Sequence, residues 1–591
     1  MPVRPAHRST AAAKPDMASL PADPPTQTAA APAAQPNAAI QYHPDSYDAA
    51  RPKVMGRHAA GEGFLKGLVA HSGVPAFYAF TPSRNDFDHF TRRVAAMGGR
   101  GRPTHWVAPG RYSLLAEVGC LYLAGPGLGE TAWQRRLDDD RRYSLCGITH
   151  TVSSDRAMDA LGELLLAPTQ SWDAVVCTSR AVKAAVERMV GGYADYIAQR
   201  VGARPALPIQ LPIIPLGVDA GAFAASTATE AMRAELRQRL QIAASDVALL
   251  FFGRLAFHAK AHPVPMLLAA QLAHELMRGD AGTTRLHFLM VGQFPNNAIA
   301  AEFRTAAPRY CPDVTVHFLD GADPPQSRAA WFAGDIFFSL SDNIQESFGI
   351  TPLEAMAAGI PCVVSDWDGY RDTVTEGETG FRIKTTMPPP TDGGDLVPRY
   401  VWGIDTYDRY IGAVSQATAV DVRAAADAIR RLAGDLALRQ SLGEAGRRRA
   451  AAFFDWRPVI GQYQALWREL ALRRRTDKLA GAGQAGLRNH GLRPDPFDMF
   501  QGHSSTQLGA DVSLRTRGED AAARLEQILS MSMNTFTGHL MLQQDEIRRM
   551  VAELAGRSRT VGELSAGRPD TERRLLMRTI AWLKKYDIVD F

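Results

Sequence analysis

Two glutamates stand close together in the middle of this 591-residue chain, on either side of a glycine-bearing loop: Glu346 and Glu354, with seven residues between them. The backbone N–H groups of Gly349, Ile350 and Thr351 open a predicted helix there and would point at an anion. Glu354 has an ordinary explanation, because Thr351-x-x-Glu354 also matches a capping box. Glu346 has no capping role, and beside a bound anion its carboxylate would accept hydrogen bonds from hydroxyl groups.

Two cations leave the carboxyl end of another predicted strand, 247–252. Arg254 lies in the sequence Gly253-Arg254-Leu255, and Lys260 follows six residues after Arg254. An arginine fork and a lysine point charge are suited to hold a diphosphate together. The alternative, for each residue taken singly, is a solvated and charged loop.

The elements that would position these groups are a strand and a helix. The apolar run 336–341 predicts a buried parallel strand, and the loop that follows leaves its carboxyl end. The helix is expected to begin with Thr351 as N-cap and Pro352 as its first residue, and to end before Gly359 and Pro361. In an open parallel sheet, such a loop borders the ligand crevice.

Short apolar runs alternate with amphipathic helical stretches along most of the chain. This alternation predicts mostly parallel, doubly wound sheets. We therefore expect an α/β protein with two doubly wound, Rossmann-like domains and a small C-terminal α-rich appendix. The predicted strands are 76–80, 105–108, 120–124, 143–149, 173–178 and 207–216 in the first half, then 247–252, 286–291, 314–319, 336–341 and 362–365.

Two further positions in the first half could face a ligand. Gly56, Gly61 and Gly63 precede the apolar helix 64–69, so that backbone could approach a ligand at a helix N-terminus. A plain strand-to-helix turn explains these glycines equally well. His150 ends a predicted strand and points into the expected crevice, although a lone histidine is more often structural than catalytic.

The stretch ESFGITPLEAMAAGIPCVVSDWDGYRDTVTEGETGF, residues 346–381, resembles the Glu-x7-Glu donor motif of retaining glycosyltransferases of the GT-B fold, family 4 (group 1) in particular. The resemblance implies two domains facing a cleft and a nucleotide-diphosphate sugar as donor. It implies that Glu346 binds the sugar hydroxyls and Glu354 the ribose, and that Arg254 and Lys260 stabilise the leaving diphosphate in place of a metal. The spacing of that cation pair is commonly one residue shorter.

The same resemblance implies further contacts. A histidine at the position of His150 contacts the donor sugar in the family, and a glycine loop corresponding to Gly56 and Gly61 faces the donor phosphate and the acceptor. This chain lacks the usual adjacent glycine pair there. The strand end around His317 and Phe318 would present backbone to the nucleobase without identifying it. The donor-binding positions implied are Gly253, Ser347, Phe348, Gly349, Ile350, Thr351, Glu354, His317 and Phe318.

Composition narrows the class of protein. With 46% hydrophobic and 22% charged residues, the chain reads as a soluble globular protein. Its apolar runs are shorter than the roughly 20 residues of a membrane span. The formal charge of +4 does not by itself suggest nucleic acid, which we do not expect as a partner. Five widely spaced cysteines without a metal-ligand pattern predict reduced thiols in a cytoplasmic protein.

The expected organisation has six parts. They are a disordered Ala/Pro-rich tail (1–45), an acceptor domain (46–218), a donor domain (219–455), a return helix (456–475), a linker (476–515) and an α-helical accessory domain (516–591) that faintly resembles a winged helix. Arginine triplets at 447–449 and 473–475 flank the return helix. They are most simply a solvated face, and the alternative is peripheral docking on anionic lipid at the inner face of the membrane.

The resulting hypothesis is a metal-independent hexosyltransferase without a cofactor, acting on a glycan, lipid or small-molecule acceptor. The accessory domain would serve a protein partner or homo-oligomerisation. One rival is a GT-B nucleotide-sugar epimerase. The other is a non-catalytic sugar-nucleotide sensor whose C-terminal domain binds DNA or a partner.

Overall fold

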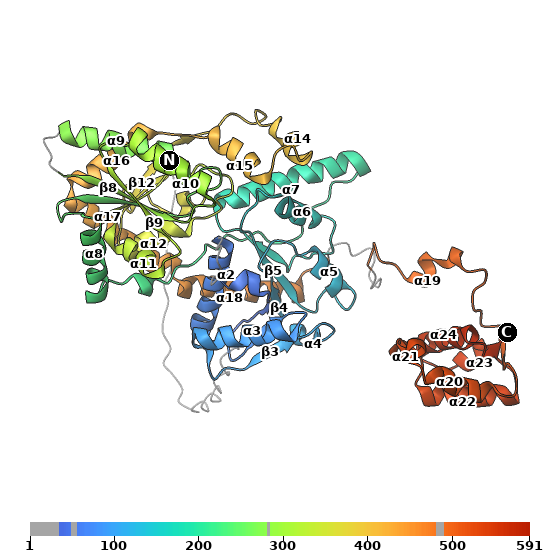
Figure 1. Ribbon diagram of the computed structural model, residues 1–591. Helices are drawn as coiled ribbons and strands as arrows, with labels where there is room; N and C mark the ends of the chain where they lie inside the picture. Colours follow the sequence, from blue (N-terminus) through green and yellow to red (C-terminus); the bar gives the residue numbers. More distant parts are fainter. Residues whose placement is uncertain (1–34, 49–55, 280–283, 480–489) are drawn as a thin grey trace, which may run out of the picture. The chain divides into compact units, whose positions relative to one another are not determined.

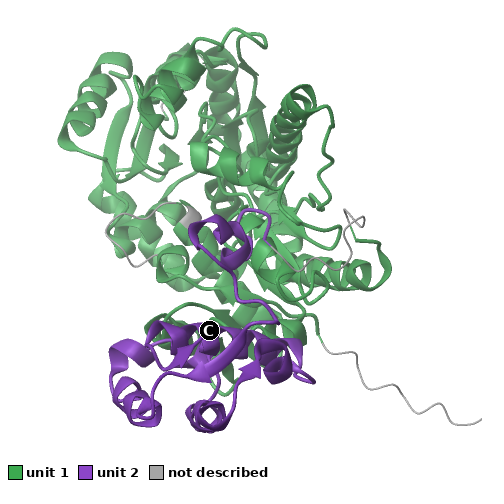
Figure 2. Ribbon diagram, turned by 90° about the vertical axis from the view of Figure 1, so that its right-hand side faces the viewer, with its two compact units in different colours: residues 1–488 green, residues 489–591 purple. Residues whose placement is uncertain are grey.

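The computed structural model describes residues 35–48, 56–279, 284–479 and 490–591, and the chain divides into two compact units, 1–488 and 489–591 (Figure 2). The larger unit contains two six-stranded sheets. The smaller one has a sheet and a hydrophobic core of its own.

The first sheet is parallel and has the order β3-β2-β1-β4-β5-β6. This is the doubly wound order, in which the chain starts in the middle and winds outward in both directions. Its strands are β1 (Ala39–Gln41), β2 (Phe77–Phe80), β3 (Thr104–Val107), β4 (Cys120–Tyr122), β5 (Ser144–Ile148) and β6 (Ala174–Val176). Its helices are α1 (Pro44–Tyr47), α2 (Gly56–His71), α3 (Arg84–Val94), α4 (Ser113–Val118), α5 (Gly129–Arg136), α6 (Asp155–Glu163) and α7 (Arg180–Val201).

The start of this sheet corrects a prediction. We expected a disordered tail up to residue 45, but Ala39–Gln41 form the central strand β1, paired on both sides with β2 and β4. Residues 1–34 lie outside the described part of the chain. The strand was missed because three residues are too few to show periodicity within an Ala/Pro-rich segment, and its partners come from later in the sequence. The run 207–216 is also not a full strand, since only isolated bridges at Gln210 and Ile213 join it to β6.

The second sheet repeats the first. Its order, β9-β8-β7-β10-β11-β12, is again that of a doubly wound parallel sheet. Its strands are β7 (Val247–Phe252), β8 (Leu286–Gly292), β9 (Thr315–Asp320), β10 (Ile336–Ser339), β11 (Cys362–Ser365) and β12 (Gly380–Ile383). Helices α8 (Thr227–Arg239), α9 (Pro263–Gly279), α10 (Asn297–Tyr310), α11 (Pro324–Ala333), α12 (Ile350–Ala358), α13 (Tyr370–Thr373), α16 (Val422–Gly434) and α17 (Leu436–Arg449) surround it (Figure 1). Two Rossmann-like domains are thereby confirmed.

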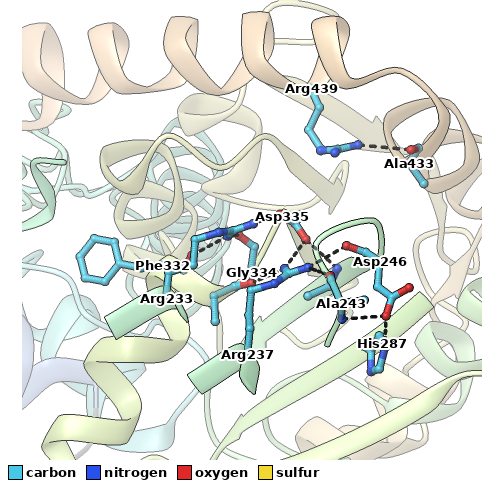
Figure 3. Close-up of polar contacts among 12 residues, drawn as sticks. Arg233, Arg237, Ala243, Asp246, His287, Phe332, Gly334, Asp335, Ala433 and Arg439 are labelled. Atoms are coloured by element: carbon cyan, nitrogen blue, oxygen red, sulfur yellow. Dashed lines mark hydrogen bonds and ion pairs between the residues drawn. The ribbon is translucent and has the colours of Figure 1, made fainter. Parts of the chain in front are cut away.

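A polar cluster at the amino end of this second sheet fastens helix α8 (Figure 3). Asp335, just before β10, accepts hydrogen bonds from Arg233 Nη2 at 2.7 Å and Arg237 Nη1 at 2.8 Å. Arg237 also donates to the backbone oxygen of Asp246 at 2.8 Å. Because these bonds satisfy buried charges at the end opposite to the strand termini that bind ligands, we assign the cluster a structural role.

One segment between β12 and α16 has no counterpart among the predicted elements. Strands β13 (Thr385–Thr386) and β14 (Ala419–Val420) pair antiparallel at its base. Between them lie α14 (Leu396–Val401) and α15 (Tyr407–Gln416). We call residues 387–418 the excursion.

The chain returns to the first domain through α18 (Trp456–Thr476), which lies beside α2 (Figure 1). The Trp456 ring fills a trough that three glycines leave open: Gly63 and Gly67 on α2, and Gly217. A Cβ built on Gly67 would lie 2.9 Å from Trp456. The absence of side chains on one helix therefore allows the other to pack closely.

The C-terminal unit is rich in helix, as expected, and it also contains a small antiparallel sheet of order β16-β15-β17 that was not predicted. Strand β15 begins inside the predicted linker. The elements are α19 (Pro496–Met499), β15 (Ser513–Thr516), α20 (Ala521–Leu529), α21 (Ser532–Thr535), α22 (Gln544–Gly556), β16 (Arg559–Thr560), α23 (Val561–Ser565), α24 (Asp570–Lys585) and β17 (Val589–Asp590). Such short strands carry too few residues for a period-two signal. Within the described ranges, none of the helices of either unit combines the length and apolar character that a membrane crossing requires.

Candidate active site

The candidate site lies where the second sheet changes winding direction. Strands β7 and β10 are neighbours. From β7 the chain continues to β8, toward one edge of the sheet, and from β10 it continues to β11, toward the other edge. Arg254 and Lys260 follow β7, and Glu346 follows β10. Ligands of open α/β sheets bind outside the carboxyl ends of the strands at this switch point. The fold thus places the predicted cations and the predicted carboxylate at the same edge.

Lys260 and Glu346 are in direct contact. Lys260 Nζ donates to Glu346 Oε2, and the two side chains are only 17% and 12% exposed. Desolvation acts to lower the pKa of Lys260, but Glu346 and Tyr370 raise it, so that the net pKa lies above that of a free lysine. Lys260 is therefore fully charged at neutral pH and held beside the carboxylate.

Arg254 adjoins this pair without sharing its carboxylate. Its Nη2 donates to the backbone oxygen of Ala259 at 3.2 Å and to the side-chain oxygen of Gln345, the residue before Glu346. Lys260, six residues after Arg254 in the sequence, reaches Glu346. The two loops are tied together, because Asn343 Nδ2 donates to the backbone oxygen of His258 at 2.8 Å.

The start of helix α12 differs from the prediction. The N-cap is Gly349, with φ of +84°, and neither Thr351 nor any other side chain caps the helix. A Cβ on Gly349 would collide with the Tyr370 ring, so this turn accepts only glycine. The helix thus starts two residues earlier than expected and the capping box with Glu354 does not form. The amides of Ile350 and Thr351 are in its first turn, where an α-helix offers no backbone acceptor.

Glu354 is consequently available for another role. Burial raises the pKa of Glu354 to about 7, and Lys260 opposes this shift. This carboxyl group is poorly solvated and close to a lysine, so it is suited to accept hydrogen bonds from the hydroxyl groups of a ligand. The C-terminal end of the helix agrees with prediction, since Gly359 adopts φ of +79° there.

Contacts between the two domains bring the carboxyl edges of both sheets together. Thr178, which follows β6, donates through Oγ1 to the backbone oxygen of Ser347 at 3.3 Å. Ser179 Oγ donates to Asp368 Oδ1 at 3.1 Å. His150 follows β5 on the first domain and is half-buried. Segments that follow strands of both sheets therefore meet beside the predicted site.

The side chains of three predicted donor-binding residues are engaged in packing or hydrogen bonding within the protein. Phe348 is 1% exposed and packs against Phe454, so its side chain is part of the core. The Nε2 atom of His317 lies 3.1 Å from Nδ1 of His287, and burial lowers the pKa of His317 to about 4, so the predicted contact with the nucleobase stays one of backbone alone. Phe318 packs against the ring of Phe294, 5.8 Å away between centroids. Because His317 and Phe318 are consecutive residues of β9 (Thr315–Asp320), their side chains point to opposite faces of the sheet.

The glycine loop is also corrected. Gly56 is the first residue of α2 and is exposed, whereas Gly61 lies inside the helix. A Cβ on Gly61 would collide with the backbone oxygen of Ser46. Gly61 therefore serves close packing of α2 against α1. Residues 49–55, which include the first part of the predicted loop, lie outside the described residues.

Comparison with known proteins bears on the second domain. Residues 232–388 match the model of the family described as glycosyl transferases group 1. The second domain is a group 1 glycosyl transferase domain. Together with the two facing sheets, this confirms the GT-B type of fold. Among the described residues, no group of three or more His, Cys, Asp or Glu side chains is placed to hold a metal ion.

Curated relatives extend the match beyond this domain. A D-inositol 3-phosphate glycosyltransferase of Geodermatophilus obscurus is 28% identical over 316 residues, or 53% of this chain and 58% of the relative. One of Corynebacterium efficiens is 31% identical over 191 residues, covering 32% and 42%. The chain thus spans about half the length of the curated relatives that it matches. A crystal structure of Anabaena HepE in complex with UDP has a TM-score of 0.48 at 16% identity, covering 73% of this chain and 98% of that one.

Sequence reasoning missed one acidic residue of the glycosyl transferase domain. Asp368, after β11, has φ of +41°, a region where aspartate is tolerated better than most residues. Burial raises the pKa of Asp368 to about 8, and the charge of Glu346 adds to the effect. The sequence DWDG, residues 366–369, indicated a turn between the strand and the next helix. No pattern within it indicated that the carboxyl group is turned toward the first domain.

Proposed function

We propose that this chain is a retaining glycosyltransferase that moves a sugar from a nucleotide-diphosphate sugar to an acceptor hydroxyl. The observation that carries the proposal is the meeting of Arg254, Lys260 and Glu346 with the start of α12 at the switch point of a group 1 glycosyl transferase domain. One polar edge then offers two cations and free amides to a diphosphate, and a carboxylate to a sugar.

The reaction breaks the bond between the anomeric carbon and the diphosphate oxygen, and the electron pair leaves with the diphosphate. Arg254, Lys260 and the amides of Ile350 and Thr351 stabilise the charge that develops there, as donors that the protein holds in place. The acceptor oxygen bonds to the anomeric carbon on the face that the diphosphate leaves, and its proton passes to the departing phosphate oxygen. No carboxylate nucleophile of the glycosidase kind is required.

Donor binding must rearrange one contact. The Lys260–Glu346 ion pair occupies groups that the donor needs. A diphosphate would take the Lys260 ammonium, and sugar hydroxyls would take the Glu346 carboxylate. Lys260 then exchanges a carboxylate for the diphosphate, and Glu346 exchanges the ammonium for hydroxyl donors, so neither group is left buried without a partner.

The acceptor is proposed from the relatives alone. Both curated relatives described above are named D-inositol 3-phosphate glycosyltransferases. A polyol phosphate is therefore the first acceptor class to test, beside glycans and lipids. The chain's match to these relatives is partial, so the test must cover all three classes.

The decisive experiment measures release of nucleoside diphosphate from a panel of UDP-, GDP- and ADP-sugars, with and without acceptors, in the presence of EDTA. Arg254→Ala and Glu346→Ala should each lower turnover by at least ~100-fold, the loss expected when one transition-state contact of about 3 kcal/mol is removed. Glu469→Ala, which removes an exposed carboxylate paired with Arg473, is the matched control. Near-normal turnover of either site variant contradicts the proposal.

The same assay separates the rivals. An epimerase would convert the donor without an acceptor and return an isomeric sugar nucleotide. A sensor would bind a sugar nucleotide without turnover. If its C-terminal unit bound DNA, the affinity of fragment 489–591 for duplex DNA would fall steeply with salt, because phosphate contacts release counterions.

A further inference from the structure

The excursion, residues 387–418, covers the loops that carry the site. Ile411 on α15 is fully buried against Ala256 and Ala259, which lie in the loop between Arg254 and Lys260. Ile344, two residues before Glu346, packs on the same cluster. Helix α15 therefore rests on both the cation-bearing and the carboxylate-bearing loops, although the mechanism above uses none of its residues.

Tyr407, the first residue of α15, connects these loops to the opposite domain. Its hydroxyl lies 2.8 Å from Ser153 Oγ, and Gln345 Nε2 donates to it at 3.1 Å. The other end of the Gln345 amide accepts from Arg254 Nη2. A continuous chain of hydrogen bonds thus runs from Arg254 through Gln345 and Tyr407 to Ser153.

The chemistry of each group fixes the direction of this chain. Arginine only donates, so Gln345 must turn its oxygen toward Arg254 and its amide nitrogen toward Tyr407. The Tyr407 hydroxyl accepts that bond and is left to donate to Ser153. If the Gln345 amide were rotated by half a turn, its N–H groups would face the N–H groups of the guanidinium, and no hydrogen bond could form. Tyr407 thus anchors the amide end that Arg254 does not hold.

The partners of Arg254 are neutral. Among the described residues, its side chain donates to an amide oxygen of Gln345 and to the backbone oxygen of Ala259. Lys260, in contrast, is paired with a carboxylate. Arg254 is therefore held in place while its positive charge remains uncompensated and available for a diphosphate.

The chain also crosses from one domain to the other. Ser153 lies in the first domain, three residues after His150, whereas the other three members belong to the second. The bond between Ser153 and Tyr407 exists only when the two domains face each other as they do here. The position of Arg254 is accordingly linked to the approach of the domains, a step that completes many active sites.

We infer that Tyr407 is a positioning residue of the glycosyl transfer proposed above: through Gln345 it sets the Arg254 guanidinium, and through Ser153 it ties that setting to domain closure. This inference rests on the proposed function. Tyr407 is not assigned a contact with the substrate. It acts on the leaving diphosphate only by way of Arg254.

The test compares two tyrosine-to-phenylalanine substitutions on one helix. Tyr407→Phe removes the hydroxyl and keeps the ring. Tyr410→Phe, three residues later, is the matched control: its ring stacks on Tyr400 at 4.7 Å between centroids, and no hydrogen bond of its hydroxyl is found among the described residues. Both variants are purified as the full chain, and their melting temperatures are measured first.

The readout is kcat and KM for the nucleotide sugar of the panel that the unsubstituted chain turns over. Tyr407→Phe should lower kcat about tenfold, the effect of one lost hydrogen bond, with a smaller change in donor KM, while Tyr410→Phe stays within about twofold. Ser153→Ala should lower kcat similarly. The double variant should be no slower than the slower single one, because both changes break the same chain.

Equal kcat values for Tyr407→Phe and Tyr410→Phe overturn the inference and leave the proposed function standing. The inference is also overturned, with the proposed function left standing, if the fold-losses in kcat of Tyr407→Phe and Ser153→Ala multiply in the double variant. Should Tyr407→Phe not fold, Ser153→Ala alone decides, since it breaks the chain from the other domain. A chain that turns over none of the nucleotide sugars overturns the proposed function itself, and the inference with it.

Discussion

Lys260 and Glu346 form an ion pair across the ends of two neighbouring strands, with side chains that are 17% and 12% exposed. Because both groups are largely removed from water, loss of one partner leaves the other charge poorly solvated. Lys260→Ala should reduce the free energy of unfolding by about 2 kcal/mol, less than for a fully buried pair because some solvent screening remains. Urea denaturation followed by tryptophan fluorescence measures it.

The double variant Lys260→Ala/Glu346→Ala provides the control for that prediction. It removes both charges, so its loss should be smaller than the sum of the two single losses. The exposed pair of Arg84 and Asp88 offers a second comparison, since Asp88→Ala should cost no more than about 0.5 kcal/mol. Strictly additive losses at Lys260 and Glu346 would show that the pair is not coupled.

Two glycine-to-alanine substitutions should have opposite signs. At Gly67 a Cβ would lie 2.9 Å from the Trp456 side chain, and Gly67→Ala should destabilise the first domain by about 1–2 kcal/mol despite its better helix propensity. Gly461, inside α18, has no atom within 4 Å of its Cβ position, so Gly461→Ala should stabilise by about 0.5–1 kcal/mol. Thermal melting of both full-length variants tests this. A stabilising Gly67→Ala would refute close packing at Trp456.

Asp368 should make stability depend on pH. Burial, together with the charge of Glu346, raises the pKa of Asp368 to about 8, whereas in the unfolded chain it titrates near its usual value of 3.8. The folded state then holds a proton that the unfolded state loses, so this group lowers stability progressively as pH rises from about 4 to about 8. Asp368→Asn keeps the shape and tolerates φ of +41°.

The variant should therefore melt higher than the unsubstituted chain at pH 8 and equally at pH 4, with the gap opening between these values. Melting curves at four or five pH values record the gap. Asp372→Asn is a useful contrast: Asp372 lies four residues later, in α13, and is bonded to Arg180, so this variant loses an ion pair and should melt lower at pH 8. A gap of constant size over the whole range would mean that Asp368 does not titrate as described.

The C-terminal unit should fold by itself. Leu514, Leu576, Ile580 and Leu583 form a core that is at most 1% exposed and draws only on residues of this unit. Fragment 489–591 should unfold cooperatively by circular dichroism. Leu576→Ala should cost about 2–5 kcal/mol, enough to abolish the transition of so small a domain. Leu492→Ala, at an 86% exposed position, should leave it unchanged. A fragment without a cooperative transition would contradict an independent core.

Much of the second domain could be predicted from the sequence. The strands at 247–252 and 362–365 agree with β7 and β11 to the residue, because buried parallel strands are continuous apolar runs bounded by turn residues. Arg254, Lys260 and Glu346 were found from their residue types and positions after strands. Because β7 and β10 are parallel neighbours, their carboxyl ends lie at the same edge of the sheet and bring these residues together.

Other features escaped prediction for identifiable reasons. Strand β1 has three residues and no periodicity of its own. The cap of α12 is Gly349 and not Thr351, at a turn where Tyr370, twenty-one residues away, leaves no room for a side chain. The glycines of α2 looked like a ligand loop until the packing partners Ser46 and Trp456 were known. His317 was placed correctly on a strand, but its contact with His287 on the neighbouring strand could not be read from the sequence.

The sequence by itself determined the local elements, the doubly wound pattern and the family motif, because apolar periodicity, turn residues and short-range spacing are properties of contiguous residues. The tertiary structure decided the contacts across long sequence separations: Lys260 with Glu346, Ser179 with Asp368, and Tyr407 between Gln345 and Ser153. These depend on where loops from different strands and domains meet. Hydrogen bonding and desolvation act over a few ångströms in space, and distance along the chain does not report them.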